Sequence, residues 1–237
     1  MAVAKLTQTM ISGKTVYYIE ADQSAISVED LGGKELTTST KFGISGTFFD
    51  SYTGTVVGIA CGYRGKEVRD DGERHANGYT RGTLVAFRPL GTQSQVVSRY
   101  VINHIKDSVP LDWIDWAIGG LSLYLNDSSI TQDSDLESKL VEVEHGQSVN
   151  GVSPAYNTDR AAIGYKSGKI VLACIKNAKP WDCRTIMASL GCYDAVMLDG
   201  STCAQIRAKN ASGQIITAGG PRSIYSIVTV DPTTTWL

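Results

Sequence analysis

The chain lacks the features that mark membrane, secreted and nucleic-acid-binding proteins. Its 237 residues contain no apolar run long enough to cross a membrane, and the N-terminal stretch has no apolar block of signal-peptide length. The 22 lysines and arginines face 24 aspartates and glutamates and form no basic cluster, so a nucleic-acid groove has no electrostatic support. We expect neither a membrane nor a nucleic-acid partner. Unless a signal segment has been removed, we expect a cytoplasmic or phage-associated protein.

The motifs of metal and triad chemistry are missing as well. The five cysteines form no C-x-x-C pair and match no zinc spacing, and no G-x-S-x-G elbow occurs. We expect the cysteines to be mainly reduced and buried, with one disulfide left open. His75, His104 and His145 each stand alone in polar segments, which is more typical of surface or loop histidines than of catalysts. The sequence therefore gives no sign of a metal site or a cofactor.

What the chain does contain predicts a folded, sheet-rich domain. Hydrophobic residues make up 42% and charged residues 19%, and 24 glycines against 6 prolines indicate many tight turns. Short apolar runs bounded by turn residues predict strands. These runs lie at 15–21, 41–51, 54–63, 81–91, 113–127 and 222–230, with hairpins at 160–175 and 204–217. We predict a single α+β domain over residues 1–237, mainly antiparallel β-sheet with few helices packed against it.

One helix is predicted, over residues 181–191. Asp182 is a good N-cap, Trp181 can pack onto Ile186, and Gly191 is a natural residue just past the helix end. The polar segment 128–159 is predicted to be irregular.

The stretch from Tyr193 to Asn210 raises a chemical question. The apolar run Ala195–Leu198 predicts a short buried strand, and it ends at Asp199, followed by Gly200-Ser201-Thr202. A carboxylate in that position lies at the mouth of a core, beside backbone N–H groups and small hydroxyls. Taken alone, the stretch is more typical of a tight turn in which Asp199 bonds to its own loop.

The remaining candidates for chemistry are charged residues beside glycines or apolar runs. Asp50 follows a Gly-Thr-Phe-Phe segment, Arg160 opens a strand, and Arg222 follows Gly-Gly-Pro. Arginine binds phosphate or carboxylate through two parallel hydrogen bonds. The alternative for both arginines is a surface ion pair. Phe48 and Phe49 are expected to pack in the core whatever the function.

Five segments, taken in order, resemble the phosphodiester glycosidase family. They are "GISGTFFD" (43–50), "WAIGGLSLYLND" (116–127), "DRAAIGYKSGKIVLACI" (159–175), "LGCYDAVMLDGSTCAQI" (190–206) and "GGPRSIYSIVTV" (219–230). They are similar to the family's Asn-Gly-Gly-Phe-Phe strand, its Gly-Gly segment, its Arg-Thr-Ala-Ile-Gly hairpin, its Leu-Asp-Gly-Gly-Gly-Ser motif and its closing Arg strand. The matches span about residues 41–230.

Two loops depart from the family pattern. Ser45-Gly46-Thr47 stands where the family has Asn-Gly-Gly, and Asp199-Gly200-Ser201-Thr202 stands where it has Asp-Gly-Gly-Gly-Ser. Hydroxyl side chains thus replace glycines in both loops. Such a change narrows a pocket and adds hydrogen-bond donors, so it bears on the choice of substrate.

The resemblance implies a hydrolase that cuts a sugar-1-phosphodiester or related glycosidic bond at the anomeric carbon, with an N-acetylglucosamine-type sugar favoured. It implies Asp199 as the carboxylate facing that carbon, acting as nucleophile, base or electrostatic stabiliser, with Arg160 and Arg222 gripping the phosphate. Asp50 is the nearest choice if a general acid is needed. The predicted substrate-binding residues are Ser45, Gly46, Thr47, Gly119, Gly120, Gly200, Ser201, Thr202 and Arg222.

Other readings stay open at this stage. The altered loops also suit a carbohydrate-binding module without catalysis, and a compact domain without an export signal suits a phage-particle accessory protein that acts on cell-wall glycans. A further enzymatic reading keeps the fold and changes the substrate to wall glycans or a nucleotide sugar. In each case the expected partner is a carbohydrate or sugar phosphate. The sequence indicates neither the sugar and aglycone nor the oligomeric state.

Overall fold

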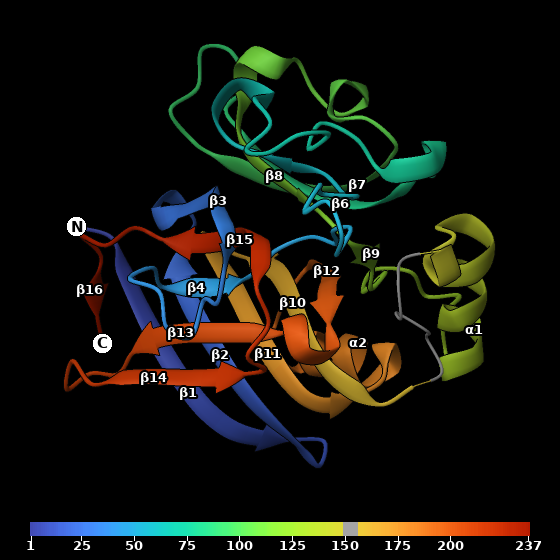
Figure 1. Cartoon of the computed structure of the whole chain (residues 1–237). Coiled ribbons are helices and arrows are strands. Elements are labelled where there is room, and N and C mark those ends of the chain that lie inside the picture. Colours follow the sequence, from blue (N-terminus) through green and yellow to red (C-terminus); the bar gives the residue numbers. More distant parts are fainter. Residues whose placement is uncertain (149–155) are drawn as a thin grey trace.

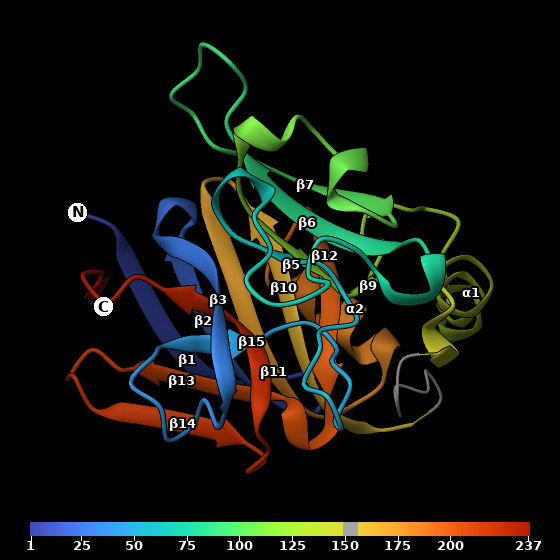
Figure 2. The same cartoon turned by 45° about the horizontal axis from the view of Figure 1, so that its top comes forward.

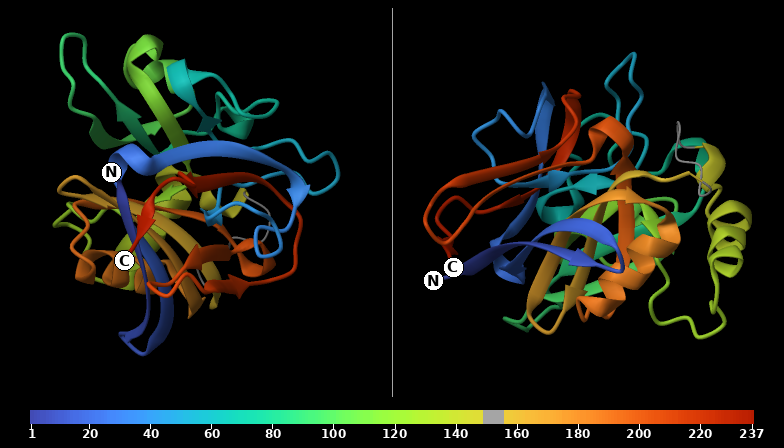
Figure 3. Two further views of the ribbon diagram at one scale, coloured as in Figure 1. Left: turned by 90° about the vertical axis from the view of Figure 1, so that its left-hand side faces the viewer. Right: turned by 90° about the horizontal axis from the view of Figure 1, so that it is seen from below.

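The computed structural model describes residues 1–148 and 156–237, and its strands form three sheets (Figure 1). The largest sheet has seven strands and is antiparallel except where β16 pairs with β1. Its order is β16 (Thr235–Trp236), β1 (Val3–Ile11), β2 (Lys14–Asp22), β11 (Lys169–Ala178), β10 (Thr158–Lys166), β12 (Asp194–Gly200) and β9 (Leu121–Ser122). The pairing of β16 with β1 brings the two chain ends close together (Figure 3).

Two smaller antiparallel sheets complete the fold. The five-stranded sheet has the order β14 (Ile215–Gly219), β13 (Gln205–Lys209), β4 (Gly43–Ser45), β15 (Ile224–Val230) and β3 (Ile26–Lys34). The four-stranded sheet has the order β5 (Ala60–Cys61), β8 (Ile114–Gly119), β6 (Arg81–Phe87) and β7 (Val96–Ile102). Figure 2 shows these two sheets lying against the same side of the large sheet.

The main core lies where the three sheets meet. Leu172 and Val196 of the large sheet, Val228 of the five-stranded sheet, and Leu84 and Trp116 of the four-stranded sheet belong to one buried cluster. Because all three sheets bury side chains into this cluster, they form one domain.

Two helices cover the other face of the large sheet. The helix α2 (Pro180–Ser189) packs Cys183, Ile186 and Met187 against β10, β11 and β12. The helix α1 (Asp133–Ser138) contacts α2 and continues into a π-helical turn at Lys139–Val143. Short 3₁₀ turns lie at Gln23–Ala25, Tyr63–Gly65, Ala76–Gly78, Ile105–Asp107, Leu111–Trp113, Gly146–Ser148 and Ser201–Cys203.

The predicted α+β class is confirmed, and so are both hairpins. The helix at 181–191 exists but begins one residue earlier, because Pro180 takes its first position. Asp182 therefore caps from inside the first turn, accepting a hydrogen bond from the Lys179 N–H at 2.9 Å. Gly191 ends the helix with a φ of 80°.

Other expectations were incomplete. The segment 128–159 is not wholly irregular, since α1 and the π turn form there, and its residues 149–155 lie outside the described part. All five cysteines are buried and free. His75 lies in a loop as expected, but it is buried and not at the surface, and its Nε2 lies 3.0 Å from the Thr83 hydroxyl. Within residues 1–148 and 156–237, no helix is long and apolar enough to span a membrane.

Candidate active site

The candidate site forms where β12 ends beside the start of β10. The β12 strand is buried up to Leu198, and Asp199 and Gly200 follow at its end. Arg160, near the start of β10, pairs with Gly200 across the two strands. The register shifts between Arg160 and Ala162, which is typical of a β-bulge, and bulges re-aim side chains at strand ends. A second shift, between Thr158 and Arg160, occurs in the pairing of β10 with β11.

The segment after β4 closes the site from the five-stranded sheet. The Asp199 N–H donates to the Gly46 carbonyl at 3.2 Å, which joins the end of β12 to this segment. Phe48 and Phe49 follow directly and are buried. A cavity of about 190 Å³ results, lined by Phe48, Phe49, Ser51, Val57, Thr158, Arg160, Asp199, Gly200, Ser201, Cys203 and Arg222.

Asp199 is the one carboxylate that lines this cavity among the described residues. Burial raises the pKa of Asp199 to about 6. Hydrogen bonds from the Cys203 thiol and from the Gly200 N–H, the latter at 2.8 Å, act in the opposite direction, as do the charges of Arg222 and Arg160. Asp199 is therefore mainly ionised at neutral pH and takes up a proton in mildly acidic solution.

The two arginines of the site differ in environment. Arg160 is fully buried, and its guanidinium donates to the carbonyls of Ala178 at 3.2 Å and Tyr156 at 2.9 Å. Burial lowers the pKa of Arg160, and the Asp199 carboxylate acts against that shift. Arg222 is exposed, with its guanidinium 5.8 Å from the centre of the Phe49 ring. Arg160 is thus fixed in place, whereas Arg222 extends toward solvent.

The loop Ser45-Gly46-Thr47 uses its polar groups to hold the five-stranded sheet together. The Ser45 hydroxyl accepts from the Gln205 N–H at 3.2 Å, and the Gly46 N–H donates to the Ser226 carbonyl at 2.8 Å. The Thr47 N–H donates to the Ser226 hydroxyl at 3.0 Å. All three residues are buried and none lines the cavity. The loop therefore lies next to Asp199 and supports the end of β12, but it does not form the wall of the cavity.

Gly119 and Gly120 lie at a close crossing of chain segments, outside the cavity lining. A Cβ atom on Gly119 would lie 2.4 Å from the His75 ring, and one on Gly120 would lie 2.2 Å from the Met197 carbonyl oxygen. The absence of side chains here lets the four-stranded sheet approach β12.

Asp50 also lies outside the cavity lining. Its carboxylate accepts from the backbone N–H groups of Tyr52 at 2.8 Å and Thr53 at 3.0 Å. These hydrogen bonds lower the pKa of Asp50, which makes it a poor proton donor. Ser201, which has a φ of 58°, and Gly200 do line the cavity, whereas Thr202 is exposed beside Gly220.

Sequence reasoning missed Cys203 as a pocket residue. Its thiol hydrogen-bonds to Asp199, and burial, together with the Asp199 charge, raises the pKa of Cys203 well above its ordinary value. The thiol thus stays protonated and acts as a weak donor. The available signal was position, since Cys203 directly follows the Asp-Gly-Ser-Thr segment. The 3₁₀ turn Ser201–Cys203 places its thiol near Asp199.

Within the described ranges, no cluster of three or more histidine, cysteine, aspartate or glutamate side chains could hold a metal ion. The groups around the cavity are a carboxylate, two guanidinium groups, a thiol and two aromatic rings.

Fold and site together define an α+β domain whose strand ends gather one carboxylate and two arginines. The chain belongs to the phosphodiester glycosidase family, whose model matches residues 38–226. No curated protein matches the chain.

Solved structures that share the fold include the following two. The first is the zebrafish N-acetylglucosamine-1-phosphodiester alpha-N-acetylglucosaminidase catalytic domain, auto-inhibited by its pro-peptide, with a TM-score of 0.60 and 16% identity over 98% of this chain and 83% of that one. The second is a hypothetical protein from Synechocystis, with a TM-score of 0.53 and 12% identity over 95% of this chain and 61% of that one.

Proposed function

We propose that this protein is a glycosidase that hydrolyses a sugar-1-phosphodiester or a related glycosidic bond at the anomeric carbon. The observation that carries the proposal is the placement of Asp199 in one small cavity with Arg160 and Arg222. A carboxylate suits a carbon that gains positive charge in an oxocarbenium-like transition state. Guanidinium groups suit the phosphate on the other side of the scissile bond.

Asp199 acts in its ionised form in this proposal. As nucleophile, as base toward water or as electrostatic stabiliser, it needs a free carboxylate, which a pKa of about 6 provides at neutral pH. A phosphate is a fair leaving group, so a strong general acid is less necessary than in ordinary glycosidases. This removes the need to assign Asp50 an acid role, for which its environment is unsuited.

The two arginines have different roles in binding the phosphate. Arg160 is fixed by two backbone carbonyls, so its charge is in place before a ligand arrives. Arg222 is exposed at the cavity and can adjust to a bound phosphate oxygen. The exposed Ser201 hydroxyl offers a further contact to sugar or phosphate.

The favoured sugar is of the N-acetylglucosamine type, supported by family membership and by the zebrafish enzyme that shares the fold. A carbohydrate-binding module, or a phage-particle accessory protein that acts on cell-wall glycans, is the alternative. The binding module is supported by Ser201, which stands in the cavity where the family pattern has glycine, and the phage-particle alternative rests only on the expectation of a compact domain without an export signal.

The decisive experiment measures sugar release from a panel of sugar-1-phosphodiesters and nucleotide sugars. Wild type is compared with Asp199→Asn and with Asp50→Asn, which changes the other nominated carboxylate outside the cavity. Release by wild type and Asp50→Asn, but not by folded Asp199→Asn, supports the proposal. Sugar binding without release, unchanged in Asp199→Asn, supports the binding module instead.

A further inference from the structure

A second cavity lies beside the first. Its volume is about 230 Å³, and it is lined by Thr55, Val56, Val57, Asp71, Arg74, Ala76 and Asn77. Val57 lines both cavities, so the two are neighbours separated by a single stretch of chain.

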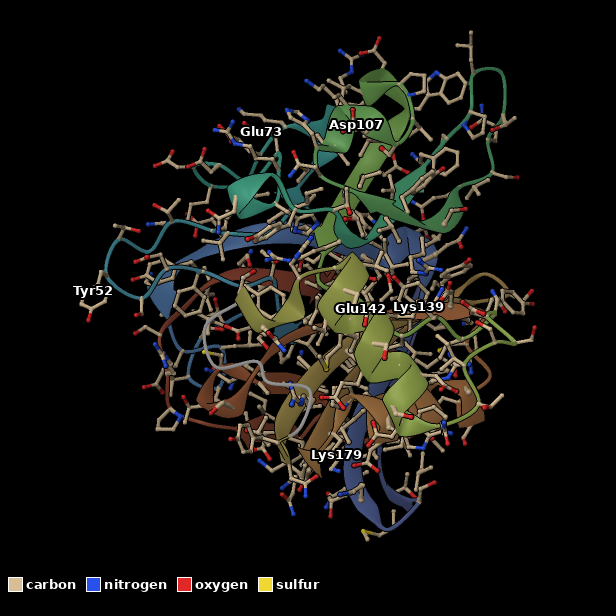
Figure 4. All side chains as sticks on the ribbon, turned by 90° about the vertical axis from the view of Figure 1, so that its right-hand side faces the viewer. Tyr52, Glu73, Asp107, Lys139, Glu142 and Lys179 are labelled. Atoms are coloured by element: carbon tan, nitrogen blue, oxygen red, sulfur yellow. The ribbon has the colours of Figure 1, made fainter. Side chains whose placement is uncertain are left out.

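That separating stretch is a small hairpin, residues 48–57. Phe49 pairs with Val56, the Val57 N–H donates to the Phe48 carbonyl at 2.9 Å, and the Asp50 N–H donates to the Thr55 carbonyl at 2.8 Å. The first arm lines the first cavity, and the returning arm lines the second, with its residue Val57 also lining the first. The tip residue Tyr52, 98% exposed, projects from the surface (Figure 4). The hairpin therefore lies between the two cavities.

The two cavities differ in charge. The first holds two guanidinium groups against one carboxylate, an excess of positive charge that suits an anion. In the second, Arg74 and Asp71 form an ion pair at 2.7 Å, which leaves no excess of either sign. Electrostatics therefore assigns a phosphate to the first cavity and an uncharged ligand to the second.

The lining of the second cavity combines apolar and hydrogen-bonding groups. Val56, Val57 and Ala76 are apolar lining residues, and Thr55 and Asn77, which carry a hydroxyl and an amide able to donate and accept hydrogen bonds, line the cavity as well. Asn77 has a φ of 60°, a backbone state that asparagine tolerates. A sugar ring has the matching chemistry, because it presents C–H groups on its faces and hydroxyls around its edge.

We propose that the second cavity binds a neutral sugar unit adjoining the cleaved bond, so that the substrate is an extended glycan and not a single-sugar phosphodiester. This inference rests on the proposed function, since it places a further part of the same substrate. Asn77 and Thr55 are its specificity-determining residues.

The test compares three substrates that share one cleavable bond. One is the methyl phosphodiester of N-acetylglucosamine, and the other two carry a neutral disaccharide either on the phosphate or on the sugar. The variants are Asn77→Gly, which removes the amide but suits the same backbone, and Thr55→Val, which removes the hydroxyl but keeps the shape. Ser12→Gly, at another positive φ in the β1–β2 turn, is the matched control.

We expect wild type and Ser12→Gly to prefer one extended substrate by about tenfold in kcat/KM, the size expected from hydrogen bonds gained. Asn77→Gly and Thr55→Val should lose most of that preference while cleaving the methyl ester normally. Equal use of all three substrates by wild type would overturn the inference and leave the proposed function standing.

If no substrate is cleaved, the proposed function fails and binding decides the inference separately. N,N′-diacetylchitobiose is then titrated into wild type and the same variants, with amide NMR shifts as the readout. Binding that weakens in Asn77→Gly and Thr55→Val, but not in Ser12→Gly, supports a sugar site in this cavity. Binding that is absent, or indifferent to both changes, overturns it.

Discussion

Arg160 and Gly200 are cross-strand partners in the pairing of β10 with β12, and a Cβ atom on Gly200 would lie 3.7 Å from the Arg160 side chain. The pairing brings a buried guanidinium alongside the end of β12, where Asp199 lies. The site is thus built into the large sheet, and the loop after β4 completes it.

The first prediction concerns Asp199→Asn and has two opposite effects. Activity should fall by about 10²–10⁴-fold, because the amide cannot act as base or nucleophile. Stability at pH 7.5 should rise by about 1 kcal/mol, because a partly buried carboxylate with a raised pKa costs free energy once it ionises. Sugar release and urea denaturation check the two effects. Lost stability together with lost activity would instead indicate a structural role.

The second prediction concerns pH. The folded-state pKa of Asp199 is raised to about 6. The protonated side chain therefore makes its full contribution to the free energy of unfolding below about pH 4, and this contribution is lost as pH rises through 6. Activity requires the ionised carboxylate, so kcat/KM should rise with pH through about 6 while stability falls. A pH profile of kcat/KM beside pH-dependent unfolding checks this. A profile that falls through pH 6 would make Asp199 an acid.

The third prediction concerns the Cys203 thiol, which lowers the pKa of Asp199 by hydrogen bonding. Cys203→Ala should move the acidic limb of the pH profile to higher pH. Cys203→Ser, which keeps a donor, should leave the limb near its wild-type place or lower. A role in packing alone would change unfolding without moving that limb.

The fourth prediction separates the two arginines. Arg160→Ala should cost about 2–4 kcal/mol of unfolding free energy, because it empties a buried space and leaves the carbonyls of Ala178 and Tyr156 without that donor. Arg222→Ala should change stability by less than about 1 kcal/mol and raise KM for phosphodiesters, since its side chain is exposed. A stable Arg160→Ala would contradict this assignment.

The fifth prediction concerns Gly119. Gly119→Ala should destabilise the fold by about 1–3 kcal/mol, because its Cβ would lie 2.4 Å from the His75 ring and 2.9 Å from the Ile59 nitrogen. The measured KM should stay near that of wild type. Unchanged stability with weaker substrate binding would restore Gly119 to the predicted substrate-binding set.

Short sequence patterns predicted those strands and helices whose formation depends on residues close together in the chain. The hairpin at 160–175 follows from its turn glycine, and the helix α2 was predicted from Asp182 and the terminal Gly191, although it begins one residue before the predicted start, at Pro180. The strand that ends at Asp199 follows from its apolar run. By contrast, β1, β3 and β7 were not predicted, because their half-exposed patterns lack a continuous apolar run.

The sequence by itself determined an α+β domain with a carboxylate at a strand end, because these depend on patterns that are short in sequence, while Arg160 and Arg222 were assigned to the same site through the family resemblance. Only the tertiary structure decided what each candidate does. Gly119 lies against the His75 ring and Arg160 lies beside Gly200, because strands pair across long separations, such as β10 with β12. Asp50 and Cys203 instead form their hydrogen bonds within their own turns, and the structure shows which partners they take. Pairing over such distances is set by the shared core of three sheets, which no local segment encodes.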